Sequence, residues 1–174
     1  MKTIAVDLDE VLADTGKKLK RLYAAEYGKT WEDEELEGND MREIIPKELL
    51  DKYLQILNEP GFFRDLEIME NAQSVMEQLN KKYKVYIVSA AMEFPNSLKD
   101  KYEWVMEYLP FISWKQIHLC GLKYIVQTDI MIDDRARNFK YLNGRKLLYT
   151  AHHNLKETDY ERVNNWQDVA EKLL

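Results

Sequence analysis

The sequence predicts an α/β fold in three layers, with a parallel sheet between helices and a small helical cap inserted into it. Short runs of β-branched residues alternate with longer stretches of helical pattern, which is typical of parallel strands joined by helical crossovers. The chain has 174 residues, of which 45% are hydrophobic. This is enough for one core, but not for two full-sized domains.

Four apolar runs predict strands, and a fifth run is weaker. The four lie at residues 3–6, 84–88, 129–132 and 146–149, and the fifth lies at residues 116–120. Because longer segments separate these runs, we expect a Rossmann-like parallel sheet with the strand order 3-2-1-4-5.

Helices are expected where apolar residues recur on one face. Residues 71–81 carry Val75 and Leu79 on one stripe, and residues 98–109 and the last turns from Trp166 onward follow the same pattern. These segments predict the helices that pack against the sheet.

The segment between the first and second strands is longer than one crossover requires. Between Asp9 and Lys84 lie 74 residues, whereas a strand-helix-strand unit needs only about 30. The surplus, about residues 29–63, is acidic at first and then helical in pattern, with glycine and proline residues between its parts. We therefore expect a core of residues 1–15 and 64–174 and an inserted helical cap of residues 16–63.

Charge and composition argue against several classes of function. The 31 acidic and 25 basic residues give a net charge of −6 and are interspersed, which argues against binding a nucleic-acid polymer or an anionic membrane. An early carboxylate interrupts the apolar N-terminus, and no later stretch reaches membrane-spanning length, so we expect a cytoplasmic protein. Cys120 is the single cysteine, which excludes an internal disulfide and a cysteine-based metal site. No sequence feature defines an oligomeric state.

Paired carboxylates follow two of the predicted strands. Asp7 and Asp9 end the first strand and point to the same side of an extended chain, where they can bind Mg²⁺ or act as nucleophile and general acid. Asp133 and Asp134 end the strand at 129–132. If the two strands are neighbours, the carboxylates converge into an oxygen-rich cation site. The alternatives are a helix cap near Asp14 for the first pair and a solvated turn for the second.

Ser89 and Lys123 are candidates for binding a phosphate next to these carboxylates. Ser89 ends the strand at 84–88, and its hydroxyl can donate to a phosphate oxygen, although serine after a strand is often a turn residue. Lys123 precedes the strand at 129–132 and can offset the charge that a phosphate and the carboxylates share. His152 and His153 are interpreted as surface-loop residues, because adjacent histidines point in different directions and lack partners at ligand spacing.

Taken in order, Asp7-x-Asp9, Ser89, Lys123 and Asp133-Asp134 resemble the four motifs of the haloacid dehalogenase superfamily of aspartate-nucleophile phosphatases. The opening Asp-Leu-Asp-Glu-Val-Leu-Ala-Asp at residues 7–14 is also similar to that of its 5′(3′)-deoxyribonucleotidase family. Later segments of the chain are similar to that family too; they lie at residues 61–66, 100–105, 123–135 and 150–154.

The resemblance implies a Mg²⁺-dependent phosphatase of (deoxy)nucleoside monophosphates that works through an aspartyl-phosphate. It implies that Asp7 is the nucleophile and a metal ligand, that Asp9 is the acid and base, and that Asp9 also gives its backbone carbonyl to the metal. Ser89 and Lys123 would hold the phosphate. Either Asp134 or Asp133 would be the direct metal ligand, with the other beside it.

The substrate is the part of this interpretation for which the sequence departs from the family. Glu10 stands where the family usually has glycine, and Ala90 and Ala91 follow Ser89 where relatives usually have Ser-Pro. Phe62 and Phe63 lie where the chain returns from the cap, so one of them is expected to contact a nucleobase or simply to pin the cap. The alternatives are a phosphatase of another small phosphorylated metabolite and a phosphoacceptor signalling module.

Overall fold

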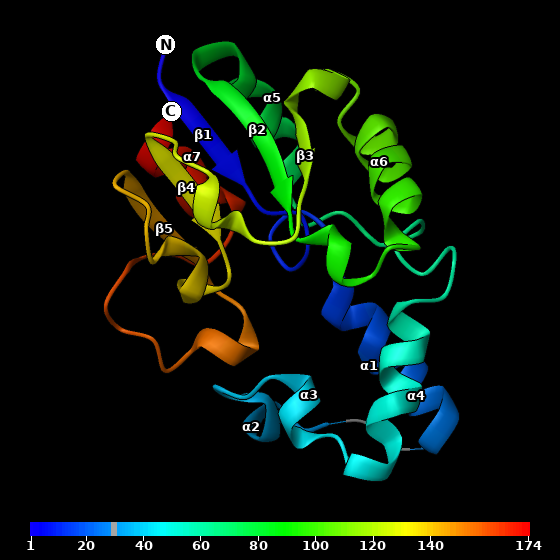
Figure 1. Ribbon diagram of the computed structural model, residues 1–174. Helices are drawn as coiled ribbons and strands as arrows, with labels where there is room; N and C mark the ends of the chain where they lie inside the picture. The colour runs from blue at the N-terminus through cyan, green and yellow to red at the C-terminus, as the bar shows by residue number, and fades with distance from the viewer. Residues whose placement is uncertain (29–30) are drawn as a thin grey trace.

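At the centre of the molecule is a parallel sheet of six strands (Figure 1). The computed structural model describes residues 1–28 and 31–174. The strands are β1 (Thr3–Val6), β2 (Lys84–Ser89), β3 (Ile117–Leu119), β4 (Ile130–Asp133), β5 (Arg145–Tyr149) and β6 (Glu161–Val163). Their order in the sheet is β3-β2-β1-β4-β5-β6.

The predicted strand order is confirmed for the first five strands, and each lies within two residues of its predicted bounds. The structure adds β6 at the edge, next to β5. Sequence patterns did not predict β6, because two of its three residues, Glu161 and Arg162, are charged and only Val163 is apolar.

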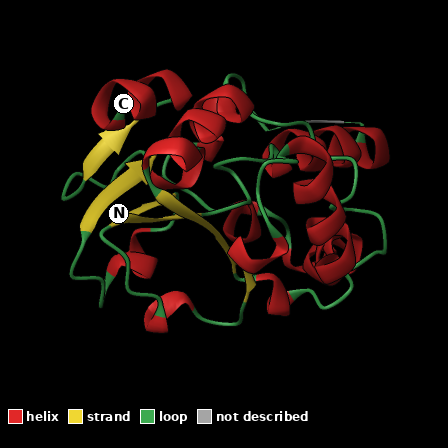
Figure 2. Ribbon diagram, turned by 90° about the horizontal axis from the view of Figure 1, so that it is seen from above, coloured by secondary structure: helices red, strands yellow, loops and turns green. Residues whose placement is uncertain are grey.

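Helices cover the sheet on one face, and shorter turns cover the other (Figure 2). The α-helices are α1 (Thr15–Tyr27), α2 (Asp33–Leu36), α3 (Met41–Ile44), α4 (Lys47–Leu57), α5 (Ala72–Lys82), α6 (Ser97–Tyr108) and α7 (Trp166–Leu173). The 3₁₀ helices are η1 (Ala91–Glu93), η2 (Trp114–Gln116), η3 (Lys123–Ile125), η4 (Ala136–Phe139) and η5 (His152–Asn154). No helix in the described ranges is long and apolar enough to cross a membrane.

Alternating side chains of the buried strands supply two hydrophobic cores. Ile4 and Val6 of β1 join the larger core, together with apolar residues of α5, α6 and α7. Ala5, between them, faces the opposite side and packs in a smaller cluster with Met131 and Phe139. This alternation is expected of strands buried on both faces, and it gives the three layers that the sequence predicted.

The segment expected to form the cap lies beyond the carboxyl ends of the strands, where α1 to α4 gather (Figure 1). Trp31 is buried and stacks on Tyr23 of α1 at a centroid distance of 4.0 Å. Lys29, at which the surplus segment was expected to begin, lies outside the described residues. The division into a cap of residues 16–63 and a core of the remaining residues stays a proposal that this arrangement supports.

Two buried tryptophans hold the loops beside the carboxyl end of β1. The indole N–H of Trp104 in α6 donates to the carbonyl of Leu66 at 2.8 Å, and that of Trp166 in α7 donates to the carbonyl of Val11 at 2.8 Å. Both rings are fully buried, so each donor reaches its acceptor in an apolar environment where an unpaired N–H would be costly. Helices from distant parts of the sequence therefore position the segments that surround the site.

Candidate active site

A pocket of about 830 Å³ lies where the carboxyl ends of β1 and β4 face the cap segment. Ligands of parallel α/β sheets bind at this edge, because the loops that leave the strands converge there. Residues of both the proposed core and the proposed cap line the pocket. The core contributes Asp7, Asp9, Ala90, Lys123 and Asp134, among others, and the cap contributes Leu36, Met41, Arg42 and Tyr53.

Three buried carboxylates meet at the floor of this pocket. Oxygen atoms of Asp7, Asp133 and Asp134 lie within 4.8 Å of one another. The cause is the neighbouring position of the two strands: the backbone N–H of Asp7 donates to the carbonyl of Ile132 at 2.9 Å, which aligns the two strand ends. The structure thus brings together the acids that the sequence placed after two different strands.

Lys123 joins this cluster as a buried cation. Its Nζ lies 2.6 Å from Oδ1 of Asp7 and 2.8 Å from Oδ2 of Asp133, and its side chain is 2% exposed. Although burial favours the neutral amine, the charges of Asp133 and Asp7 outweigh it and raise the pKa of Lys123 above its ordinary value. Lys123 is therefore a fixed positive charge beside Asp7.

One cation does not balance the charge of the cluster. Burial raises the pKa of Asp7 well above its ordinary value, and the charges of Asp133, Asp134 and Asp9 act in the same direction against the opposing effect of Lys123. Both the Lys123 contact and the backbone N–H of Leu8 use Oδ1 of Asp7, so Oδ2 is not used by either. A further cation at this position would stabilise the charged form of Asp7.

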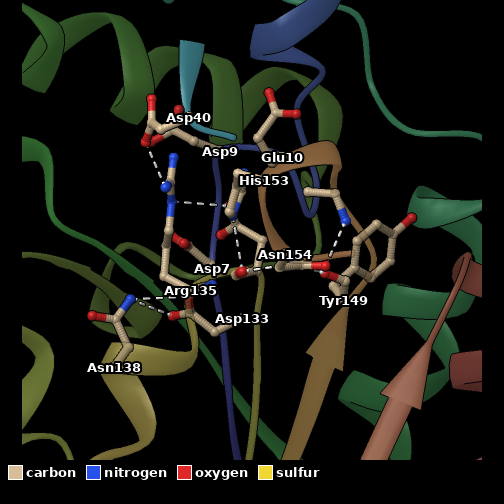
Figure 3. A network of polar contacts seen from close by, with 12 residues as sticks. Asp7, Asp9, Glu10, Asp40, Asp133, Arg135, Asn138, Tyr149, His153 and Asn154 are labelled. Carbon is tan, nitrogen blue, oxygen red and sulfur yellow. Dashed lines mark hydrogen bonds and ion pairs between the residues drawn. The ribbon is translucent and has the colours of Figure 1, made fainter. Parts of the chain in front are cut away.

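Asp133 and Asp134 are adjacent in the sequence but have different surroundings; Figure 3 shows Asn138 beside Asp133. Asp133 accepts hydrogen bonds at both oxygens: Arg135 and Asn138 donate to Oδ1, and Lys123 and Asn138 donate to Oδ2. Burial is the main cause that raises the pKa of Asp133. Asp134, by contrast, lines the pocket. Burial favours its neutral form, but a hydrogen bond and charge from His153, with Arg135 and Lys123, together lower the pKa of Asp134.

Asp9 forms an ion pair with Lys101, a residue for which the sequence predicted no role in the site. Nζ of Lys101 in α6 lies 2.5 Å from Oδ2 of Asp9 and 3.2 Å from Oγ of Ser89. The hydroxyl of Thr15 also donates to Asp9 at 3.3 Å. Ser89 is fully buried beneath this group, and Lys101 lines the pocket. A second buried cation is thus in place beside the acids.

Glu10 follows Asp9 and adopts a left-handed backbone conformation with φ of 60°. Its carboxylate lines the pocket and accepts a hydrogen bond from the backbone N–H of Gly16 at 2.5 Å. Burial, followed by the charge of Asp134, raises the pKa of Glu10 to about 8. The third acid therefore binds the first turn of α1 and has a reduced negative charge at neutral pH.

The two phenylalanines at the return from the cap differ in position. Phe63 lines the pocket, and Nζ of Lys101 lies 4.3 Å from the centre of its ring. Phe62 packs edge-on against Phe63 with ring centres 4.8 Å apart, and Nζ of Lys18 lies 4.7 Å from the centre of the Phe62 ring. Ala90 also lines the pocket. Phe63 is thus the one of the pair with access to a ligand.

Residues 152–154 lie beside the acidic cluster, a position that the sequence did not predict for the two histidines. His152 and His153 both line the pocket, and Nε2 of His153 lies 3.2 Å from Oδ2 of Asp134. The interpretation of His153 as a surface-loop residue is therefore wrong, although the two histidines do have different partners: Lys20 lies 3.3 Å from His152. The sequence alone does not show that these histidines lie beside the acids, because this contact depends on the pairing of β5 with β4 in the folded sheet.

The donor set of this site fits a hard divalent cation. The groups that converge are carboxylate oxygens, which Mg²⁺ and similar ions prefer over nitrogen or sulfur ligands. Burial, and after it the charges of the neighbouring acids, raise the pKa of Asp7, so a bound cation would stabilise its charged form. Of the three carboxylates in this cluster, those of Asp7 and Asp134 line the pocket.

The fold is similar to that of haloacid dehalogenase-like hydrolases. A haloacid dehalogenase-like hydrolase from Streptococcus pneumoniae superposes with a TM-score of 0.63 at 14% identity, covering 100% of this chain and 99% of that one. A hydrolase of this superfamily from Deinococcus radiodurans, solved with bound phosphate and sodium, gives a TM-score of 0.60 at 15% identity, with 99% and 95% covered. At these identities the likeness concerns the fold alone.

Sequence comparisons specify the family. The model of the family "5′ nucleotidase, deoxy (Pyrimidine), cytosolic type C protein" matches residues 1–174. A Bacillus subtilis 5′(3′)-deoxyribonucleotidase is 39% identical over 175 residues, which cover 99% of each chain. A Staphylococcus aureus protein that carries the same name provisionally is 42% identical over 176 residues, or 99% of this chain and 96% of that one. This chain belongs to the 5′(3′)-deoxyribonucleotidase family and is a phosphoric monoester hydrolase of the nucleotidase type.

Proposed function

We propose that this enzyme hydrolyses (deoxy)nucleoside monophosphates with the help of Mg²⁺ and through an aspartyl-phosphate on Asp7. The observation that carries the proposal is the meeting of three buried carboxylates with buried Lys123 at the floor of one pocket. The name of the Bacillus subtilis relative supports the substrate class. Membership of a nucleotidase family argues against the alternative of a phosphoacceptor signalling module.

Asp7 and Asp134, together with the backbone carbonyl of Asp9, are the proposed ligands of Mg²⁺. Asp133 is assigned a place behind them, because Lys123, Arg135 and Asn138 already donate to both of its oxygens. Bound Mg²⁺ would reduce the repulsion between the substrate phosphate and the carboxylates.

In the first step, an oxygen of Asp7 attacks the phosphorus atom, and the bond between phosphorus and the ester oxygen breaks. Asp9 donates a proton to the departing oxygen, so that a neutral nucleoside leaves. Lys101 and Thr15 hold the Asp9 carboxyl group beside Asp7, which places the proton donor near the bond that breaks.

In the second step, Asp9 takes a proton from a water molecule, and that water attacks the phosphorus of the aspartyl-phosphate. The bond to Asp7 breaks, inorganic phosphate leaves, and both carboxyl groups return to their starting state. Lys123 next to Asp7 and Ser89 beneath Asp9 are the proposed phosphate-binding residues. The positive charge of Lys123 stabilises the additional negative charge on the phosphoryl oxygens.

The nucleoside is proposed to lie toward the cap, against Phe63 and Ala90. A nucleobase presents a flat apolar face that packs on an aromatic ring, and Phe63 offers such a ring in the pocket wall. Phe62 is assigned a supporting role, because it packs against Phe63, which is the ring that lines the pocket.

A nucleotide panel tests this proposal. The purified chain is assayed with deoxyribonucleoside 5′- and 3′-monophosphates, ribonucleotides, sugar phosphates and p-nitrophenyl phosphate, each with Mg²⁺ and with EDTA. Higher kcat/KM for the nucleotides, and loss of turnover in EDTA, would support it. A preference for sugar phosphates would favour the alternative, a phosphatase of another small metabolite. The cytoplasmic location expected from the sequence stays a prediction.

A further inference from the structure

The segment after β5 brings two side chains to the end of β4, and both contact Asp134. Nε2 of His153 lies 3.2 Å from the carboxylate oxygen Oδ2 of Asp134 and 3.0 Å from its backbone carbonyl oxygen. Nδ2 of Asn154 donates to the same carbonyl at 2.8 Å. Figure 3 shows both residues next to the acidic cluster. One short 3₁₀ helix, η5, thus holds both the backbone and the side chain of a proposed metal ligand.

Asn154 makes this contact rigid. Its Nδ2 also donates to the carbonyl of Tyr149 at 2.7 Å, and its Oδ1 accepts from Arg162 at 2.8 Å and from the backbone N–H of Ala151 at 3.2 Å. The side chain is 2% exposed. Because donors and acceptors of this amide are all engaged, the position of η5 relative to Asp134 is fixed by several hydrogen bonds at once.

His153 adds a contact that Asn154 does not make, because it reaches the carboxylate itself. Its side chain is 14% exposed, against 4% for that of Asp134, so the contact lies at the inner wall of the pocket. The hydrogen on Nε2 exists in the charged imidazole and in one neutral tautomer, so the ring can donate in either state. With Oδ2 of Asp134 used by His153, Oδ1 is the oxygen that this contact leaves for a cation.

We propose that His153 is a positioning residue for the metal site: it fixes the carboxylate of Asp134 in the orientation that holds the divalent cation, and so sets the affinity for that cation. The inference rests on the proposed function, because it takes Asp134 as a metal ligand. Carboxylates that bind metals are held by hydrogen bonds from a surrounding layer of residues, and loss of such a bond weakens metal affinity by about 10- to 100-fold.

The test measures metal binding directly. Mn²⁺ serves as the probe, and its free concentration is followed by electron paramagnetic resonance during titration of the metal-free protein; Mg²⁺ is then measured by competition. The variants are His153→Leu, which removes the donor, and His153→Gln, which keeps an N–H donor. His118→Leu is the matched control, because His118 lies exposed on β3 and packs against Tyr86.

We expect His153→Leu to weaken Mn²⁺ and Mg²⁺ binding by at least tenfold. The affinity of His153→Gln for these ions should lie between that of His153→Leu and that of the wild type. At saturating Mg²⁺, kcat of His153→Leu should return to within about threefold of the wild type, because His153 does not act on the phosphate. His118→Leu should bind Mn²⁺ as the wild type does.

A folded His153→Leu protein that binds Mn²⁺ as tightly as the wild type would overturn the inference. If that variant does not fold, His153→Asn takes its place, since its shorter side chain cannot span the same distance; wild-type affinity there would overturn the inference equally. Failure of the proposed function has a different signature, because the wild-type protein itself would then bind no Mn²⁺ or hydrolyse no nucleotide with Mg²⁺.

Discussion

The carboxylate of Glu10 accepts a hydrogen bond from the backbone N–H of Gly16 at 2.5 Å and thereby closes the loop between β1 and α1. A Cβ atom on Gly16 would lie 3.1 Å from the same carboxylate, which would have to move by a few tenths of an ångström to accommodate it. Glu10 itself has a φ of 60°, a left-handed conformation that favours glycine. The chain therefore keeps a glycine-type backbone at this position but uses the side chain to bind the start of a helix.

Replacement of Glu10 should reveal this strain. Glu10→Ala and Glu10→Gly both lose the hydrogen bond to Gly16, but only alanine retains the unfavourable left-handed conformation. We expect Glu10→Gly to exceed Glu10→Ala in free energy of unfolding by about 1 kcal/mol, measured by urea unfolding of the metal-free proteins. Equal stability of the two variants would mean that the backbone of this loop is not strained in solution.

Asp7→Asn should leave the fold intact and remove nearly all phosphatase activity. An amide cannot form the aspartyl-phosphate, so kcat should fall by on the order of a thousandfold or more. Removal of a buried carboxylate whose pKa is raised by burial should not destabilise the protein. Circular dichroism checks the fold, and beryllofluoride, which traps the acylphosphate state, should fail to bind. Wild-type turnover by a folded Asp7→Asn variant would contradict the proposed mechanism.

Metal dependence should separate Asp134 from Ser89. Activity should disappear in EDTA and return with Mg²⁺, and Asp134→Ala should weaken the affinity for Mg²⁺ more than Ser89→Ala does. The reason is that Asp134 belongs to the carboxylate cluster, whereas Ser89 contacts Lys101 and Asp9. The activation constant for Mg²⁺ in steady-state assays measures the difference. Equal constants for the two variants would remove Asp134 from the metal site.

Substrate preference should depend on Phe63 more than on Phe62. Phe63→Ala is expected to lower kcat/KM for nucleotides by up to about tenfold while sparing p-nitrophenyl phosphate, because stacking on one aromatic ring contributes about 0.5–1.5 kcal/mol. Phe62→Ala is the matched control for loss of a buried ring, and its main effect should be on the melting temperature. If both variants lose activity on all substrates equally, the two rings are structural.

An ion-pair network at the edge of the sheet predicts a pH dependence of stability. Arg145 donates two hydrogen bonds to Glu161 of β6, and Lys172 of α7 donates a third. The contacts with Arg145, and next those with Lys172, lower the pKa of Glu161 to about 2 despite partial burial. In the unfolded chain this carboxylate has its ordinary pKa, so its contribution is present above that value and is lost as the pH falls toward 2.

Glu161→Gln should therefore lower the free energy of unfolding at pH 7 by up to about 1 kcal/mol, since the group is partly exposed and screened by solvent. The difference from the wild type should shrink steadily below about pH 4.5. Urea unfolding at pH 7, 4 and 3 measures it, with Glu77→Gln as a control on an exposed helical pair with Lys81. A difference that stays constant over this range would exclude the network as its cause.

The core of the fold was readable from the sequence because its strands are apolar runs separated by long helical segments. Buried strands of a parallel sheet need apolar residues on both faces, as in residues 3–6 and 130–132. The order of the strands then followed from ordinary crossover rules. β6 was missed, because Glu161 and Arg162 are charged and a single apolar residue, Val163, leaves no hydrophobic pattern to detect.

The pocket was only partly readable. The acids could be predicted because two strands of one predicted sheet both end in paired carboxylates, Asp7 with Asp9 and Asp133 with Asp134. Lys101 resembles any lysine of an amphipathic helix, and its burial depends on how α6 packs beside β2 and the cap. His153 was missed for a related reason: its contact with Asp134 depends on the adjacency of β4 and β5, a long-range property that local spacing does not encode.

The hydrogen bond from Trp166 to Val11 means that the loop beside the pocket can be fixed only after residue 166 has been translated. Val11 lies in the loop that follows Asp7 and Asp9, whereas Trp166 begins α7, so this loop obtains its hydrogen-bond partner from a helix that lies 155 residues further along the chain and is translated later. β1 likewise lies between β2 and β4, which are both translated later. A nascent chain that stalls before residue 166 would carry every acid of the site and still lack the contact that holds the loop in place.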